Sequence, residues 1–328
     1  MSNKIVVLGS NSFSGASFCR HLLSQGKEVI ALSRSVEPID ALLPYKWQDK
    51  PLAFYQYDLN HNLADIEKLL AIEKPKHIYN FAAQSMVGQS WQHPEHWFMT
   101  NTVSTIQFHN MLRKVDWLDR YIHISTPEVY GSCSGYVQEN KNYQPSTPYA
   151  VSRAAADMSL HTFNDVYDFP VSFTRATNVY GAGQQLYRII PRAILAILQQ
   201  GTLSLHGGGH SERSFIHIDD VSAATLAIGE KGNNGEIYHI ATKDTVSIRG
   251  LVQQICKLMD YPFERLCEAS EDRLGKDSAY LLDSSKVRNE LAWQDNILLE
   301  NGLKETIKWL TDNYQVLKIQ PSEYIHKA

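Results

Sequence analysis

The fold of this chain is decided near its N-terminus by the stretch KIVVLGSNSFSG, residues 4–15. A short, nearly all-apolar run leads into Gly9, and a helical pattern follows. We expect Gly9 to supply a tight turn after a strand, and Gly15 to let the helix pack closely on that strand. The N–H groups and positive end of such a helix bind a pyrophosphate. The stretch therefore predicts a dinucleotide site that includes Gly9, Ser12, Phe13 and Gly15.

Strand and helix patterns alternate through the first half of the chain. Strands are predicted over residues 4–8, 28–32, 53–58, 77–81, 121–125 and 170–175, and helices over residues 14–25, 63–72, 96–114 and 148–167. Nearly continuous apolar strands suit a parallel sheet covered on both faces. We predict an α/β protein with a doubly wound Rossmann sheet over residues 1–180. A smaller, interleaved α/β substrate lobe is expected over residues 181–328, with some later segments returning to the first domain.

The second half has a different rhythm. Helices are predicted over residues 188–199, from residue 220, and over residues 300–313, and strands over residues 214–217 and 237–241. Ser247 is a good N-cap residue and is expected to open a further helix.

Composition excludes several classes of protein. The 328 residues carry a formal net charge of −4, which argues against a nucleic-acid binder that relies on a basic face. No apolar run approaches the ~18 residues of a membrane span, and the N-terminus lacks a secretory h-region, so a cytoplasmic protein is expected. The four cysteines are scattered and no histidines have zinc-site spacing. We therefore expect free thiols and no metal site.

The end of the second predicted strand indicates which dinucleotide binds. NAD enzymes carry an acidic residue there for the ribose 2′-hydroxyl, whereas this strand ends at Ser33 and Arg34. A guanidinium beside hydroxyl groups suits a 2′-phosphate, so we predict NADP as the cofactor and NAD as second choice. Further cofactor contacts are expected at the ends of the third and fourth strands, from Asp58, Leu59, Phe81, Ala82 and Ala83.

Two segments carry candidate catalytic groups. Residues 125–131 (STPEVYG) follow the fifth predicted strand, and residues 149–153 (YAVSR) lie in the first turns of a helix. Ligands of such sheets bind at the carboxyl ends of the strands. Tyr149 and Arg153 share one helical face. The cation favours the phenolate, which makes Tyr149 a usable base near neutral pH, and both side chains are expected to contact the cofactor.

With these motifs the sequence resembles the extended short-chain dehydrogenases/reductases and, within them, the nucleotide-sugar 4,6-dehydratases of the dTDP-glucose and GDP-mannose types. The resemblance runs from residue 4 to about residue 313. It also includes residues 82–87 (AAQSMV), 175–181 (RATNVYG), 213–221 (RSFIHIDDV) and 273–277 (RLGKD).

The resemblance implies a three-step reaction on a nucleoside-diphosphate sugar. Tyr149 takes the proton of the 4-hydroxyl, to which Thr126 is hydrogen-bonded, while the nicotinamide takes the C4 hydride. The new ketone acidifies the C5 proton, and Glu128 removes it as water leaves C6. Return of the hydride to C6 gives a 4-keto-6-deoxy sugar. Thr126, Glu128, Tyr149 and Arg153 are thus the expected catalytic residues.

Two residues depart from the family pattern. Pro127 stands where the dTDP-glucose branch has an Asp that protonates the leaving hydroxyl. The GDP-mannose branch also lacks that Asp, so Glu128 is expected to act as both base and acid. Arg153 replaces the Lys of the Tyr-x-x-x-Lys motif. It keeps the charge but is bulkier and planar, so the exchange is not neutral, although we expect catalysis to be retained.

The resemblance also implies the substrate contacts and the assembly. Ser85, Thr126 and Glu128 are expected to meet the sugar. Cationic and amide side chains suit the diphosphate, and the matching positions are Asn178, Arg188, Arg213, Arg273 and Lys276. The helices over residues 96–114 and 148–167 resemble the pair through which family members dimerise as a four-helix bundle, so a homodimer is expected.

Two alternative functions remain. One is a nucleotide-sugar epimerase or a UDP-glucuronate decarboxylase of the same superfamily, since the decarboxylases share the Ser-Thr-x-Glu-Val-Tyr-Gly segment. The other is a non-catalytic dinucleotide-binding protein, which the replacement at Arg153 leaves open.

Overall fold

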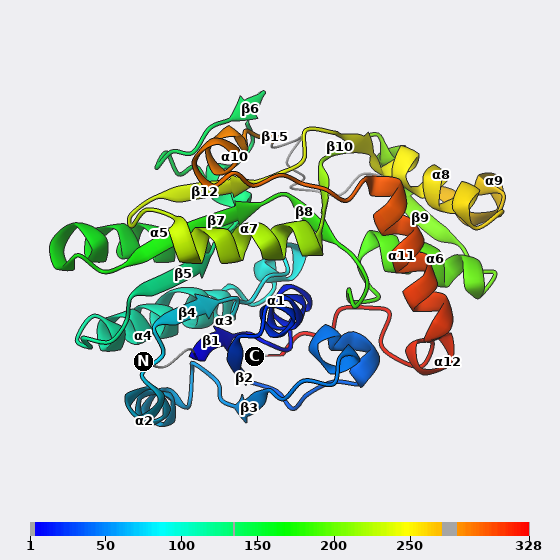
Figure 1. Ribbon diagram of the computed structural model, residues 1–328. Helices are drawn as coiled ribbons and strands as arrows, with labels where there is room; N and C mark the ends of the chain where they lie inside the picture. The colour runs from blue at the N-terminus through cyan, green and yellow to red at the C-terminus, as the bar shows by residue number, and fades with distance from the viewer. Residues whose placement is uncertain (1–3, 134, 271–280, 328) are drawn as a thin grey trace.

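A seven-stranded parallel sheet forms the centre of the protein (Figure 1). The computed structural model describes residues 4–133, 135–270 and 281–327. The strand order is β12-β7-β5-β4-β1-β2-β3, and all neighbouring strands run parallel. The strands are β1 (Lys4–Leu8), β2 (Glu28–Ser33), β3 (Ala53–Gln56), β4 (His77–Asn80), β5 (Arg120–Ile124), β7 (Val171–Ala176) and β12 (Ile237–Ile240). This confirms the predicted doubly wound architecture.

Helices cover both faces of the sheet, which explains the continuous apolar strands. In β1, Ile5 and Val7 belong to the same core as helices α1 (Phe13–Ser24) and α7 (Ile218–Lys231). The alternate residues Val6 and Leu8 pack in a second core with α2 (Leu63–Glu73), α4 (Thr105–Leu112) and α5 (Pro148–Tyr167). Because successive side chains of a strand point to opposite faces, a strand buried on both sides needs apolar residues at every position.

The order of the strands fixes where a ligand can bind. β1 lies between β2 and β4. The chain therefore continues from β1 to β2 and β3 on one side of β1, and later forms β4 and β5 on the other side. A crevice opens outside the carboxyl ends of the strands at such a reversal. In the register Leu8 pairs with Leu32 and with Asn80. The segments that follow these three residues therefore meet at this crevice.

The predicted helix over residues 96–114 is present as a continuous helical run over residues 94–112, but a π-helical turn lies within it. α3 (Pro94–Phe98) and α4 are joined by a π-helical turn, η4 (Met99–Ser104). The hydroxyl of Thr105 donates to the carbonyl oxygen of Thr100 at 2.8 Å, and the buried amide of Asn101 donates to Ser152 Oγ at 3.0 Å. The wider turn satisfies buried polar groups, which apolar periodicity does not reveal.

A second, smaller core lies beyond Tyr180. It is built by helices α6 (Ile189–Leu198), α8 (Ile248–Leu258), α9 (Phe263–Leu266) and α11 (Leu299–Asp312). Two-stranded pairs accompany them: β8 (Asn178–Tyr180) with β11 (Phe215–His217), β9 (Leu203–His206) with β14 (Cys267–Ser270), and β10 (Glu212–Arg213) with β13 (Val246–Ser247). α7, β12 and α10 (Ser285–Leu291) return to the large sheet. The two parts are thus interleaved, and one cut near residue 180 does not separate them.

Helix starts follow their sequence signals. The hydroxyls of Ser12, Thr147 and Ser247 accept from the backbone N–H three residues later, at 3.0–3.1 Å, which confirms the cap predicted at Ser247. The remaining short elements are η1 (Asp40–Leu42), η2 (Pro44–Trp47), η3 (Gly88–Trp91), η5 (Pro127–Tyr130), β6 (Tyr136–Val137), η6 (Gly207–Gly209), β15 (Leu281–Leu282) and α12 (Tyr314–Leu317).

Two further sequence expectations bear on the class of protein. All four cysteines are free thiols, as predicted. Among the helices that the structure describes, none combines the length and apolarity needed to cross a membrane.

Candidate active site

A cavity of about 420 Å³, here called the main pocket, occupies the crevice at the carboxyl ends of β1, β2 and β4. Most residues predicted to contact a dinucleotide line it, namely Gly9, Ser12, Ser33, Arg34, Asp58, Leu59, Phe81, Ala82 and Ala83. Phe13, the first residue of α1, instead lies in the core, and the described lining does not include Gly15, Tyr149 or Arg153. Residues from strand ends that are far apart in sequence thus share one wall.

Two glycines allow the close contacts at the base of the main pocket. Gly9 has φ +77°, and a Cβ on it would lie 2.6 Å from the backbone nitrogen of Ala82. A Cβ on Gly15 would lie 2.3 Å from the carbonyl oxygen of Gly9. Both distances are too short for any real side chain. Ser12 caps α1 at this point, so the positive end of the helix meets the pocket.

The other pocket residues come from the ends of the second and third strands. Ser33 is buried and Arg34 is half-buried. The guanidinium of Arg34 donates to the carbonyl oxygen of Lys327 at 3.3 Å. The carboxylate of Asp58 accepts from the N–H of Asn60 at 2.8 Å. Asp58 lines the main pocket, where contact with an adenine amino group is predicted.

The segment around η5 and the first turn of α5 bring the predicted catalytic residues together. Thr126 caps η5, and its hydroxyl accepts from the N–H of Glu128 at 3.3 Å. Pro127 occupies the first turn of η5, where its missing N–H costs no hydrogen bond. Tyr149 lies in the first turn of α5 and is only 8% exposed. Its hydroxyl is hydrogen-bonded to Thr126, and the carboxylate of Glu128 is close enough to act on its ionisation.

Several groups tune the pKa of Tyr149. Burial raises it above the usual value for tyrosine, and the negative charge of Glu128 raises it further. The positive charges of Arg153 and Arg188 and the hydrogen bond with Thr126 act in the opposite direction. The net shift is upward, so a cation near the phenol matters for any role as a base.

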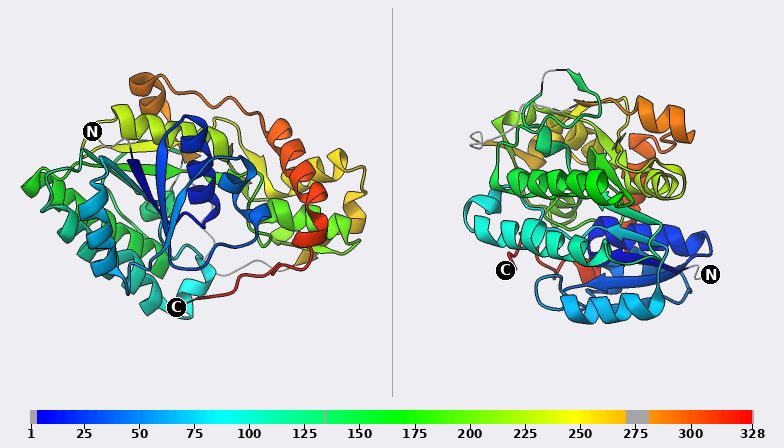
Figure 2. Two further views of the ribbon diagram at one scale, coloured as in Figure 1. Left: turned by 60° about the horizontal axis from the view of Figure 1, so that its bottom comes forward. Right: turned by 90° about the vertical axis from the view of Figure 1, so that its left-hand side faces the viewer.

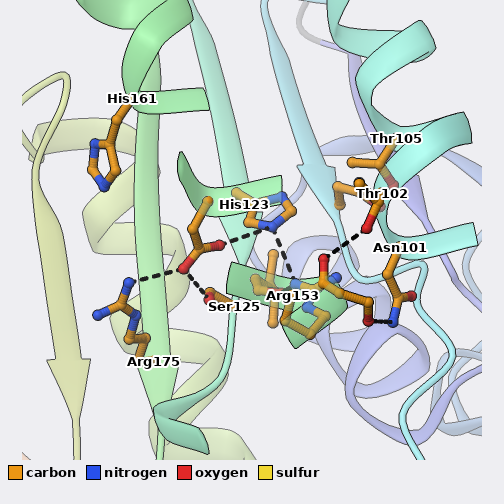
Figure 3. Close-up of polar contacts among 12 residues, drawn as sticks. Asn101, Thr102, Thr105, His123, Ser125, Arg153, His161 and Arg175 are labelled. Carbon is orange, nitrogen blue, oxygen red and sulfur yellow. Dashed lines mark hydrogen bonds and ion pairs between the residues drawn. The ribbon is translucent and has the colours of Figure 1, made fainter. Parts of the chain in front are cut away.

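Arg153 points into the protein, between α5 and β5 (Figure 3). It is 2% exposed. Its guanidinium donates to the carbonyl oxygen of Ile124 and lies 3.1 Å from His123 Nε2. In this rotamer it acts on Tyr149 through its charge, while contact with a cofactor ribose remains a prediction.

Beside Arg153 lies a buried carboxylate, Asp157. It accepts from the guanidinium of Arg175 at 2.8 Å and from the hydroxyl of Ser125 at 2.6 Å, and it lies 3.4 Å from His123. These three partners are labelled in Figure 3. Burial alone would raise the pKa of Asp157, but the hydrogen bond with His123 and the charge of Arg175 hold it well below its usual range. Removing one partner from such a buried pair typically costs about 3–5 kcal/mol. This cluster therefore fixes α5, and with it Tyr149, against β5.

The predicted substrate residues lie around the catalytic groups to different degrees. Ser85 is exposed, and Asn178 donates to the carbonyl oxygen of Ser214 at 3.3 Å. Arg188 is exposed at the start of α6 and close enough to affect Tyr149. Arg213 donates to the carbonyl oxygen of Glu212. Arg273 and Lys276 lie outside the described residues.

Tyr187, after β8, lines the main pocket next to the predicted substrate residue Arg188. Residues from 320 to 327 also line the main pocket and were not predicted to do so. No glycine pattern, apolar period or family motif marks the latter segment, because its position depends on tertiary contacts alone.

Within the part of the chain that the structure describes, one group of side chains could hold a metal ion. His93, Glu95 and His96 each offer a ligand atom within 4.8 Å of the others. The spacing of these residues matches no zinc motif, so the sequence predicts no metal site.

Comparisons with known proteins place this geometry in a family. The family model for GDP-mannose 4,6 dehydratase matches residues 6–306. A dTDP-glucose 4,6-dehydratase of Xanthomonas campestris pv. campestris is 30% identical, over 94% of this chain and 93% of that protein. The dTDP-D-glucose 4,6-dehydratase of Mus musculus is 31% identical, over 76% of this chain and 71% of that protein.

Solved structures give the same result. The dTDP-glucose 4,6-dehydratase DesIV of Streptomyces venezuelae, solved with NAD bound, has a TM-score of 0.88 and 29% identity, over 95% of this chain and 98% of its own. The UDP-glucuronic acid 4-epimerase of Bacillus cereus, in complex with UDP-glucuronic acid and NAD, has a TM-score of 0.86 and 26% identity, over 95% and 100% of the two chains. The chain therefore belongs to the GDP-mannose 4,6-dehydratase family, within the extended short-chain dehydrogenases/reductases.

Proposed function

We propose that this protein is a nucleotide-sugar 4,6-dehydratase, a lyase that converts a nucleoside-diphosphate hexose to its 4-keto-6-deoxy derivative. The observation that carries the proposal is the convergence of a buried phenol, Tyr149, with the hydroxyl of Thr126 and the carboxylate of Glu128. Epimerases of this superfamily need no carboxylate there. The names of the matched relatives support the same activity.

The main pocket fits a nicotinamide dinucleotide. Its turn is so crowded that only glycine fits at Gly9, and the capped end of α1 can receive a pyrophosphate. When bound, the dinucleotide supplies the oxidation and later reduction of the sugar. Gly9 and Ser12 would hold the pyrophosphate, and Asp58 and Ala82 would lie beside the adenosine and ribose parts.

The protein side chains then move the protons. Tyr149 accepts the proton of the sugar 4-hydroxyl, while Thr126 orients that hydroxyl. Glu128 removes the C5 proton, which the adjacent 4-ketone has acidified, and returns a proton to the hydroxyl that leaves C6 as water. When the hydride returns to C6, C5 regains one proton, which balances the proton that Tyr149 took from the 4-hydroxyl. Because Pro127 has no proton to donate, one carboxylate carries both duties. Glu128 is half-buried, so part of its side chain is accessible to solvent.

Cations assist on both sides of this reaction. The buried charge of Arg153 stabilises the phenolate of Tyr149. In the Tyr-x-x-x-Lys motif of the family the lysine has this role, and Arg153 retains it in this rotamer. Arg188 lies toward the second lobe. Together with Asn178, Arg213, Arg273 and Lys276, it would bind the diphosphate, while Ser85 would contact the sugar.

The substrate class is tested by incubating the protein with a panel of nucleotide sugars and weighing the products. Loss of one water is expected from at least one hexose. Loss of carbon dioxide from a glucuronate would indicate a decarboxylase, and an unchanged mass with altered stereochemistry an epimerase. Tight dinucleotide binding without turnover would favour a binding protein. Tyr149→Phe should lower turnover at least ~100-fold, whereas the exposed control Tyr136→Phe should not.

Cofactor choice has two opposing indications. Ser33 and Arg34 line the pocket and favour the 2′-phosphate of NADP, whereas similar structures were solved with NAD bound. If NADP is the cofactor, Arg34→Ala should weaken binding of the NADP form roughly ten-fold or more, because a charge-assisted hydrogen bond is lost, and leave binding of the NAD form unchanged. Calorimetric titration of both dinucleotides checks this. Arg265→Ala is the exposed control. Tighter wild-type binding of NAD than of NADP would overturn the NADP prediction.

The link between Glu128 and Tyr149 predicts a pH effect. The carboxylate raises the pKa of Tyr149, so Glu128→Gln should lower that pKa. The phenolate then forms at lower pH, and the rise of single-turnover sugar oxidation with pH should move to lower pH. Glu67→Gln, on the exposed side of α2, should leave the profile in place. An unchanged profile in Glu128→Gln would show that Tyr149 does not sense this carboxylate.

We also propose that the protein is a homodimer through α3, η4, α4 and α5. These helices lie side by side (Figure 2). They expose Met99 (48%), Val103 (43%), Val151 (38%) and Met158 (48%) on the outside of the molecule, an apolar patch of the kind that marks an interface. Met158→Asp should convert a dimer to a monomer in sedimentation analysis. The matched control is Ile72→Asp on α2, where an isoleucine is 79% exposed. A monomeric wild type would reject the dimer.

A further inference from the structure

The end of the described chain returns to the large sheet. After α11 and α12 in the second lobe, the chain runs back to the large domain and ends beside α3 and beside Arg34, which follows β2 (Figures 1 and 2). Residues 320–327, here called the clasp, make this crossing. They lie outside residues 6–306, which the family model matches.

The clasp forms a wall of the main pocket. Six of its residues line the cavity, namely Gln320, Pro321, Glu323, Tyr324, Ile325 and Lys327. They line the same cavity as the glycine turn and the ends of β2 and β4. A ligand in the pocket would therefore touch a segment that is held to the Rossmann domain by tertiary contacts alone.

A buried amide anchors the far end of the clasp. Gln84 is 2% exposed, and its Nε2 donates to the carbonyl oxygen of Lys327 at 2.6 Å. Asn101 holds the backbone of Gln84 on both sides, at 2.8 and 2.9 Å. Arg34 donates to the same oxygen of Lys327 at 3.3 Å. A buried amide without a hydrogen-bond partner costs free energy. The bond from Gln84 to Lys327 therefore favours the position in which the clasp lies against the main pocket.

An aromatic contact holds the neighbouring residue. The ring of His326 lies parallel to Trp97, with centroids 4.9 Å apart and planes 12° apart. Its Nε2 lies 2.8 Å from Nδ1 of His96, a hydrogen bond between the two rings. Trp97 is fully buried and is therefore held in place on α3, so the ring of His326 packs against a fixed partner.

The near end of the clasp is tied to the second lobe. Glu323 pairs with Arg192 of α6 at 3.2 Å, an exposed contact of little strength by itself. Tyr324 meets Tyr187 edge to face, with centroids 5.6 Å apart. The clasp thus connects the two lobes along the main pocket. Its strongest contacts are those of its C-terminal residues, His326 and Lys327.

We propose that the clasp is a retention device that closes the dinucleotide pocket and slows exchange of the bound cofactor. The proposal rests on the function assigned above, in which the main pocket holds the dinucleotide. It suits that chemistry, because a reaction that oxidises and then reduces the same sugar regenerates its cofactor in place. Such an enzyme loses nothing when the cofactor leaves slowly.

The test measures release of reduced dinucleotide, without sugar, after a chase with excess unlabelled dinucleotide. Deletion of residues 321–328 should speed release at least ten-fold. His326→Ala, which removes the ring contacts with Trp97, His96, His93 and Tyr324, should speed it about three-fold. Ser322→Ala, an exposed position within the clasp, should release at the wild-type rate. Circular dichroism establishes that each variant is folded, and His326→Ala decides the matter if the deletion does not fold.

The outcomes separate this proposal from the proposed function. A wild-type protein that binds no dinucleotide would reject the function itself. Binding with an unchanged release rate in both the deletion and His326→Ala would reject the clasp alone. Slower release from the deletion would also overturn it, because the segment would then compete for the pocket rather than cover it.

Discussion

Steric crowding at the end of β1 is the constraint on which the site depends. The turn at Gly9 passes so close to the backbone at Ala82 that a Cβ would lie 2.6 Å from a nitrogen, and Gly15 is pressed against the same turn. This lets the ends of β1 and β4 and the start of α1 share one wall. A side chain at either position would force these elements apart and fill the place of a pyrophosphate. The shape of the main pocket at the end of β1 and the start of α1 therefore depends on the absence of a side chain at Gly9 and at Gly15.

The chemical groups depend on a second constraint, a buried electrostatic cluster. Tyr149 stands on α5, and α5 is fixed to the sheet by Asp157, Arg175, His123 and Arg153. Such a cluster contributes little net stability over apolar packing, yet it specifies one arrangement, because any shift would leave a buried charge unpaired. Here it also sets the electrostatics, since Arg153 opposes the effects of burial and Glu128 on the phenol.

The parts of this structure that the sequence could predict are those set by local rules. Apolar strands, the glycine turn and the cap at Ser247 all have local signals, and the large sheet was predicted from them. The π-helical turn at η4 was not, because Asn101 and Thr105 bond to partners that periodicity does not reveal. Likewise, the inward rotamer of Arg153 depends on His123 and the Ile124 carbonyl, and the clasp depends on Gln84 and Trp97. The comparisons established the family, while the roles of the individual site residues rest on geometry and resemblance.

The central claim is that Tyr149 and Glu128 act in sequence on one sugar ring. Stopped-flow absorbance of Glu128→Gln, loaded with oxidised dinucleotide and mixed with the substrate sugar, tests it most directly. If the claim holds, oxidation by way of Tyr149 proceeds while elimination is blocked. About one equivalent of reduced nicotinamide per site should then accumulate and persist, with no dehydrated product. Turnover at the wild-type rate, or no reduction of the nicotinamide at all, would contradict the account.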